Sequence, residues 1–151
     1  VVNLAPMQTA ETQLKISFFK VGVGDIGLEQ LALDHLSAYE IYPDPDYHYA
    51  AAAYFYRLKD IERSAQYVRL AYEELSEEWD VAELMALILA HEGDKASANE
   101  VLDEVKRALE DKIEALESYE DPSWHEASLK SIERTRVEIN DPDFGKSEDS
   151  E

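Results

Sequence analysis

Two stretches of the chain decide the fold: FYRLKDIERSAQYVRLAYEEL, Phe55–Leu75, and LAHEGDKASANEVLDEVKRAL, Leu89–Leu109. The second lies 34 residues after the first and shares few of its letters. Both place an aspartate at the same point, Asp60 and Asp94, and apolar residues at the same later points. An aspartate followed by apolar residues at i, i+3, i+4 and i+7 is typical of a capped amphipathic helix. Each stretch is therefore predicted to be a turn followed by a helix.

The composition favours an all-α protein. Only five glycines and five prolines occur in 151 residues, and 45% of the residues are hydrophobic. There is no cysteine, which excludes disulfides, cysteine-ligated zinc, iron–sulfur clusters and thiol catalysis. We expect about seven helices, over residues 10–21 with Thr9 as cap, 26–41 with Asp25 as cap, 46–58, 61–75, 81–91, 95–119 and 122–139.

Aligning residues 45–78 with 79–112 reveals a repeat of residue classes. Small residues match where two helices of a pair would cross, at Ala52 with Ala86 and Ser64 with Ala98. Lys59 matches Gly93, which has the residue type that commonly ends a helix in the left-handed conformation. We therefore expect a left-handed Lys59.

The helix–turn–helix of 34 residues resembles a divergent tetratricopeptide repeat. The family signature has Trp, Leu-Gly and Tyr in the first helix, then Ala, Phe and Pro. Here His48 and Ala82 stand at the Trp position, Ala52 and Ala86 replace the Gly, and Ser76 and Glu110 replace the Pro.

This resemblance implies a right-handed stack of antiparallel helix pairs in a single domain, 1–139. Its units are about 12–44, 45–78 and 79–112; a long helix continues to about 120, and helix 122–139 caps the stack. Residues 140–151 are expected to be an acidic disordered tail.

No catalytic, metal or cofactor site is expected. His35, His48, His91 and His125 do not form a zinc-binding spacing. PDPDYH at 43–48 is interpreted as a turn and helix cap, and GVGDIG at 22–27 joins two helices instead of following a strand. We expect no enzymatic activity.

Tetratricopeptide-like stacks bind a peptide or helix along a face lined by the first helix of each unit. The resemblance places these contact residues there: Tyr49, Ala53, Tyr56, Arg57, Glu83, Leu87 and His91. Seven aromatic residues crowd positions 39–56. They have two interpretations, packing between helices and a recognition surface.

The expected function is a non-enzymatic adaptor or scaffold that binds a segment of a partner protein. Two alternatives are a small acidic chaperone for a secretion or assembly client and a self-associating structural subunit. The net charge of −20 favours a basic or apolar partner and disfavours nucleic acid; adaptation to salt also explains it.

No apolar run reaches the roughly 18 residues of a membrane span. The chain starts with Val1, so the expected location is cytoplasmic or, if a targeting segment was removed, periplasmic or extracytoplasmic.

Overall fold

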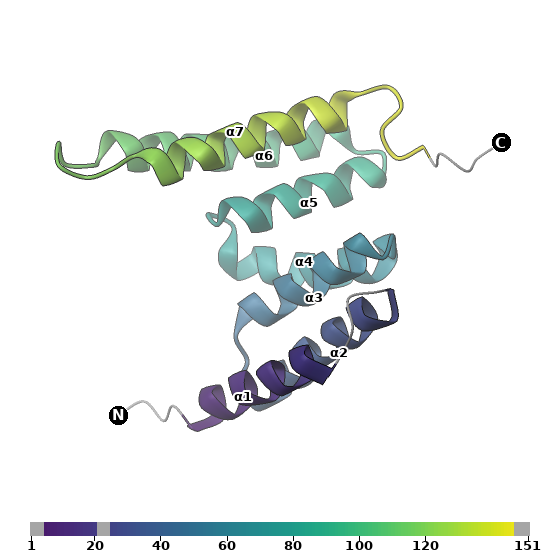
Figure 1. Cartoon of the computed structure of the whole chain (residues 1–151). Coiled ribbons are helices and arrows are strands. Elements are labelled where there is room, and N and C mark those ends of the chain that lie inside the picture. Colours follow the sequence, from purple (N-terminus) through teal and green to yellow (C-terminus); the bar gives the residue numbers. More distant parts are fainter. Residues whose placement is uncertain (1–4, 21–24, 147–151) are drawn as a thin grey trace. The chain divides into compact units, whose positions relative to one another are not determined.

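The computed structural model describes residues 5–20 and 25–146 (Figure 1). Within these ranges the chain forms seven helices and no strand, which confirms the all-α class. The helices are α1 (Ala5–Lys20), α2 (Asp25–Ile41), α3 (Pro45–Arg57), α4 (Ile61–Leu75), α5 (Trp79–His91), α6 (Lys95–Glu114) and α7 (Ser123–Asn140). Contacts group the chain into two compact units, Val1–Glu74 and Leu75–Glu151.

In the first unit, α1 packs on α2 and α2 packs on α3. A buried cluster of Ala32, Ala51 and Phe55 joins α2 to α3. The helices α3 and α4 approach each other closely at Ser64, whose buried Oγ donates a hydrogen bond of 2.8 Å to the Ala52 carbonyl. A small residue at each of these two positions permits that approach, as the sequence predicts.

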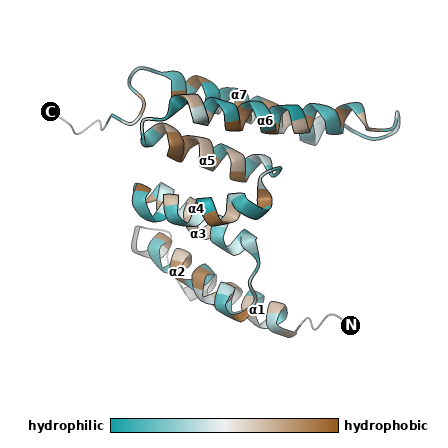
Figure 2. Cartoon of the chain, turned by 180° about the vertical axis from the view of Figure 1, so that it is seen from behind, coloured by the Kyte–Doolittle hydropathy of each residue, from teal (hydrophilic) through white to brown (hydrophobic). Residues whose placement is uncertain are grey.

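In the second unit, α5 packs against both α6 and α7, and α6 packs against α7 (Figure 1). Hydrophobic colour covers much of α5, whereas α6 and α7 alternate between hydrophobic and hydrophilic residues (Figure 2). Most of the apolar side chains of α5 are buried: Val81, Ala82, Leu84, Met85, Ala86, Ile88 and Ala90. The sequence predicts this helix as the buried element of its unit, and the structure confirms it.

The turn between α3 and α4 reverses the chain through one left-handed residue, Lys59, whose φ is +62°. The Lys59 amide donates to the Tyr56 carbonyl and the Asp60 amide to the Phe55 carbonyl, both at 2.9 Å. These two bonds form a Schellman motif, which satisfies carbonyls at the helix end. Asp60 Oδ1 then accepts the Arg63 amide at 3.0 Å and caps α4.

The turn between α5 and α6 repeats this pattern atom for atom. Gly93 has a φ of +88°; its amide donates to the Ala90 carbonyl at 3.0 Å, and the Asp94 amide to the Leu89 carbonyl at 2.9 Å. Asp94 Oδ1 accepts the Ser97 amide at 3.0 Å. The predicted left-handed residue and the predicted aspartate cap are thus confirmed in both turns.

The first helix begins earlier than expected. α1 starts at Ala5, and Thr9 lies inside it instead of capping it. The Thr9 hydroxyl donates to the Ala5 carbonyl at 2.9 Å, a bond within the helix that competes with the capping role. The expected end at Val21 lies outside the described residues, as does the turn of the expected unit 12–44. Similarly, α5 begins at Trp79 and not at 81.

The sixth helix ends at Glu114, not near 119. The Glu117 amide bonds the Glu120 side chain at 3.1 Å and is diverted from the helical ladder. Continuing the helix would also place these carboxylates at its negative end, which is unfavourable. The expected start of α7, with Asp121 as cap and Pro122 as first helical residue, is off by one position, because Pro122 is the cap residue and α7 begins at Ser123. Asp121 lies one residue before the cap and accepts the Ser123 amide at 2.9 Å.

The expectation of a disordered tail is wrong for residues 141–146. Asp141 Oδ1 accepts the Asp143 amide at 2.8 Å. The Phe144 amide donates to the Asp141 carbonyl at 3.0 Å, and the Lys146 amide to the Asp143 carbonyl at 3.1 Å. These bonds make an ordered turn after α7. Residues 147–151 lie outside the described residues.

The left-handed Lys59 predicts that glycine stabilises this position. Lys59→Gly should raise the free energy of unfolding by a few tenths to about 1 kcal/mol, because glycine adopts this conformation without strain. Urea denaturation measures the change. Gly93→Ala is the matched control; nothing lies within 4 Å of the added Cβ, so backbone strain alone should destabilise it. An unchanged or lower urea midpoint for Lys59→Gly contradicts the strain at Lys59.

The burial of α5 predicts a second difference in stability. Leu84 is 6% exposed, so Leu84→Ala should lower the free energy of unfolding by about 2–5 kcal/mol. Leu129 in α7 is only half-buried, and the same change there should cost clearly less. Equal losses in chemical denaturation would place the core elsewhere.

Candidate functional site

One stripe of α3 carries four of the expected contact residues. Tyr49, Ala53 and Tyr56 follow one another at i, i+4 and i+7, so they share a face of the helix. All three are half-buried, whereas the adjacent Arg57 is exposed. Asp44 fixes the start of this helix by accepting the Asp46 amide at 2.9 Å, which is the cap role expected for PDPDYH. The structure therefore brings these four residues together in the first unit.

The neighbouring aromatic residues of α3 pack against α2. The His35 ring lies 6.2 Å from the Tyr47 ring and 5.4 Å from the Tyr54 ring, measured between centroids. His35 Nδ1 is 2.7 Å from the Leu31 carbonyl oxygen, a contact that fixes the ring. For this face of α3, packing between helices is the interpretation that the geometry supports.

A third face of α3 contributes to a continuous row of rings. Tyr39 stacks on His48 at 3.8 Å, His48 lies 5.8 Å from Tyr67, and Tyr67 stacks on Phe55 at 5.9 Å. The Arg63 guanidinium caps the row, 4.3 Å above the Phe55 ring. Burial lowers the pKa of His48, and two nearby carboxylates oppose that shift. These rings thus join α2, α3 and α4, and they are packing residues.

Asp60 is more than a helix cap. Its second carboxylate oxygen accepts a hydrogen bond from Arg63 Nε, and the same guanidinium lies 3.3 Å from Glu29 Oε1 of α2. The hydrogen bonds from Arg63 hold the pKa of Asp60 below its usual value. The exposed ion pair between Arg63 and Glu29 adds only modestly to the free energy of unfolding. It does link the first turn of α4 to α2.

In the second unit, Glu83 is engaged within the chain. Ser131 Oγ of α7 donates to its carboxylate at 2.9 Å, and Thr135 Oγ1 donates to the same carboxylate. Glu83 is half-buried, so the two hydroxyls replace water around the charge. The expected role as an open contact residue is not what this geometry favours. Leu87, on the same helix, is half-buried.

His91 is covered by the turn that follows α7. The Phe144 ring lies 4.5 Å from the His91 ring between centroids, and Lys95 Nζ contacts the Asp141 carbonyl oxygen at 3.4 Å. Burial lowers the pKa of His91, and the Glu138 carboxylate opposes that shift. His91 therefore belongs to an internal contact between the end of α5 and residues 141–146.

The sequence did not reveal a polar network that binds α6 to α7. Arg136 donates to Asp103 Oδ1 at 2.6 Å and to Asn99 Oδ1 at 3.0 Å. Asn140 Nδ2 also donates to Asn99 Oδ1, at 3.1 Å. These partners lie more than thirty residues apart. From the sequence, only the expectation that α6 and α7 face each other could have suggested that these polar side chains meet.

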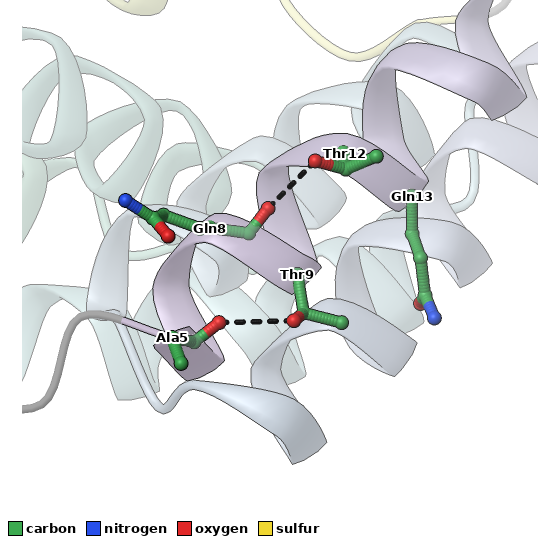
Figure 3. Close-up of a pocket in the computed structure, with 5 residues that line it drawn as sticks. All are labelled: Ala5, Gln8, Thr9, Thr12 and Gln13. Atoms are coloured by element: carbon green, nitrogen blue, oxygen red, sulfur yellow. Dashed lines mark hydrogen bonds between the residues drawn. The ribbon is translucent and has the colours of Figure 1, made fainter.

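A shallow depression lies over the exposed side of α1 (Figure 3). It is lined by Ala5, Gln8, Thr9, Thr12 and Gln13. Its two hydroxyls are directed at their own helix, since Thr9 bonds the Ala5 carbonyl and Thr12 bonds the Gln8 carbonyl (Figure 3). A surface formed by one helix, with its hydroxyls already used, offers little to a ligand.

Across residues 5–20 and 25–146, no three His, Asp or Glu side chains gather where they could hold a metal ion. In the same part of the chain, no helix is long and apolar enough to cross a membrane. No protein-family model, curated protein or solved structure matches this chain. The resemblance to tetratricopeptide repeats therefore stays a prediction.

The contact at Glu83 predicts a specific loss of stability. Thr135→Val removes one donor from a half-buried carboxylate and should lower the free energy of unfolding by about 1–2 kcal/mol. Ser128→Ala is the matched control, because the Ser128 hydroxyl only bonds the Trp124 carbonyl of its own helix. That change should cost less than about 0.5 kcal/mol. If thermal or urea unfolding shows no difference between the two variants, Glu83 is not held by α7.

Proposed function

We propose that the chain is a non-enzymatic protein-interaction module of the tetratricopeptide type. The observation that carries the proposal is the shared turn: an identical Schellman motif and aspartate cap at Lys59–Asp60 and Gly93–Asp94. A turn that recurs after 34 residues in different letters is typical of helical repeats. In such modules the turns and crossings maintain the fold, and the other positions are open to partner recognition.

The proposed contact surface is the α3 stripe, defined as Tyr49, Ala53, Tyr56 and Arg57. Two tyrosines at a spacing of seven flank a small residue, Ala53, on one face of α3, and all three residues are half-buried. Tyrosine supplies a large contact area at low entropic cost and is enriched among residues that dominate binding energy. The partner expected at this surface is a short helical or extended segment of another protein.

The overall charge of −20 favours partner segments that are basic or apolar, because an acidic segment would be repelled. Glu83 and His91 take no part in the proposed surface, since Ser131, Thr135 and Phe144 engage them within the chain.

The proposal predicts which variant loses binding. Peptides selected from a random library against the whole chain should bind Tyr56→Ala more weakly by about 1–2 kcal/mol, as measured by calorimetry. The helical circular dichroism signal should stay intact. Leu70→Ala, at an exposed leucine of α4, is the control and should bind like the parent.

Two outcomes contradict the α3 stripe. One is a folded Tyr56→Ala variant that binds every selected peptide as well as the parent. The other is a Tyr56→Ala variant that loses its helical signal, which would make Tyr56 a packing residue like Tyr54.

A further inference from the structure

The hairpin of α6 and α7 extends well past the start of α5, so α5 leaves its outer turns uncovered (Figures 1 and 2). We call this end, residues 110–126, the hairpin tip. Tyr119, in the connection, is 86% exposed, and Trp124, in the first turn of α7, is 68% exposed. Two large rings therefore stand in water within six residues of each other. Single exposed apolar residues are common, but a pair of rings at an uncovered helix end suggests an interaction surface.

Hydrogen bonds hold the backbone around these rings in place. The Glu120 amide donates to the Glu117 carbonyl at 2.9 Å, and Glu120 Oε1 accepts the Glu117 amide at 3.1 Å. Asp121 Oδ1 accepts hydrogen bonds from the Ser123 hydroxyl and from the Ser123 amide, the latter at 2.9 Å, and these two bonds lower the pKa of Asp121. The connection is therefore an ordered turn, so binding there has little chain entropy left to lose.

The charge of the hairpin tip selects its partner. Residues 110–126 contain seven acidic side chains and one basic side chain, Lys112, a denser negative charge than the chain has on average. Anionic partners, including a second copy of this acidic chain, would be repelled there. Exposed tyrosine and tryptophan rings attract guanidinium and ammonium groups, and flanking carboxylates strengthen that attraction.

We propose that the hairpin tip is a second docking surface, specific for an arginine- or lysine-rich segment of a partner protein. Trp124 and Tyr119 receive the cationic side chains on their faces, and the surrounding carboxylates pair with the remaining charges. The hairpin tip shares no residue with the α3 stripe, so either proposal can fail without the other. Tyr56→Ala should leave docking at the hairpin tip unchanged.

The test is a titration of the full-length chain, labelled with ¹⁵N, with a short amphipathic peptide bearing arginines on one face and leucines on the other. The chain has two tryptophans, so two indole N–H signals report on Trp79 and Trp124 separately. The chemical shift of the Trp124 indole N–H should change during the titration, and that of the Trp79 indole N–H should remain constant. The same peptide with glutamate in place of arginine should not bind, and added salt should weaken binding of the arginine peptide.

Variants locate the surface. Trp124→Ala and Tyr119→Ala should each weaken binding by about 2–5-fold. Val137→Ala, at a side chain of α7 that is 74% exposed, should have no effect. Glu126→Lys should weaken binding more than Glu138→Lys, because only the first lies at the hairpin tip.

Five results overturn the proposal. The arginine peptide does not bind, or it binds without moving the Trp124 signal. The glutamate peptide binds equally well. Val137→Ala weakens binding as much as Trp124→Ala does. The Trp124 signal moves with protein concentration in the absence of peptide, which assigns the surface to a second copy of the chain.

Discussion

The reversal of the chain at Lys59–Asp60, and again at Gly93–Asp94, is the constraint on which the helical hairpins depend. In each turn a left-handed residue lets the next amide reach back five residues, and the aspartate caps the helix that follows. The carbonyls at the end of one helix and the amides at the start of the next are thereby satisfied within a few residues. This geometry sets where each second helix begins. It therefore also sets which of its residues meet the first helix.

Local chemistry explains how much of this structure could be predicted. The left-handed Lys59, the Asp60 cap and the close crossing at Ser64 each follow from a residue type at a fixed spacing, and each is confirmed. The surroundings of Glu83 and His91 could not be predicted. Their partners lie in α7 and in the turn after it, about fifty residues away, and no spacing rule connects such positions. The end of α6 was missed because the Glu120 side chain competes for the Glu117 amide.

The difference between local and distant contacts also bears on the two proposed contact surfaces. His48, Tyr54 and Phe55 of α3 contact rings on α2 and α4, and the stripe of Tyr49 and Tyr56 proposed for partner recognition lies on another face of the same helix. In the second unit, the uncovered end of the α6–α7 hairpin presents Tyr119 and Trp124 among carboxylates. Burying the apolar residues of α5 requires helices α6 and α7 only over the length of α5. Their outer turns are therefore free of that structural demand and can carry a separate binding function.

Scalar couplings through hydrogen bonds, measured by NMR on the labelled chain, test the shared turn most directly. We predict a correlation between the Asp60 amide nitrogen and the Phe55 carbonyl carbon. A second correlation should join the Asp94 amide nitrogen to the Leu89 carbonyl carbon. Correlations to the carbonyls one residue later, as in a helix that simply continues, would contradict the shared turn and with it the repeat. So would a correlation in only one of the two turns.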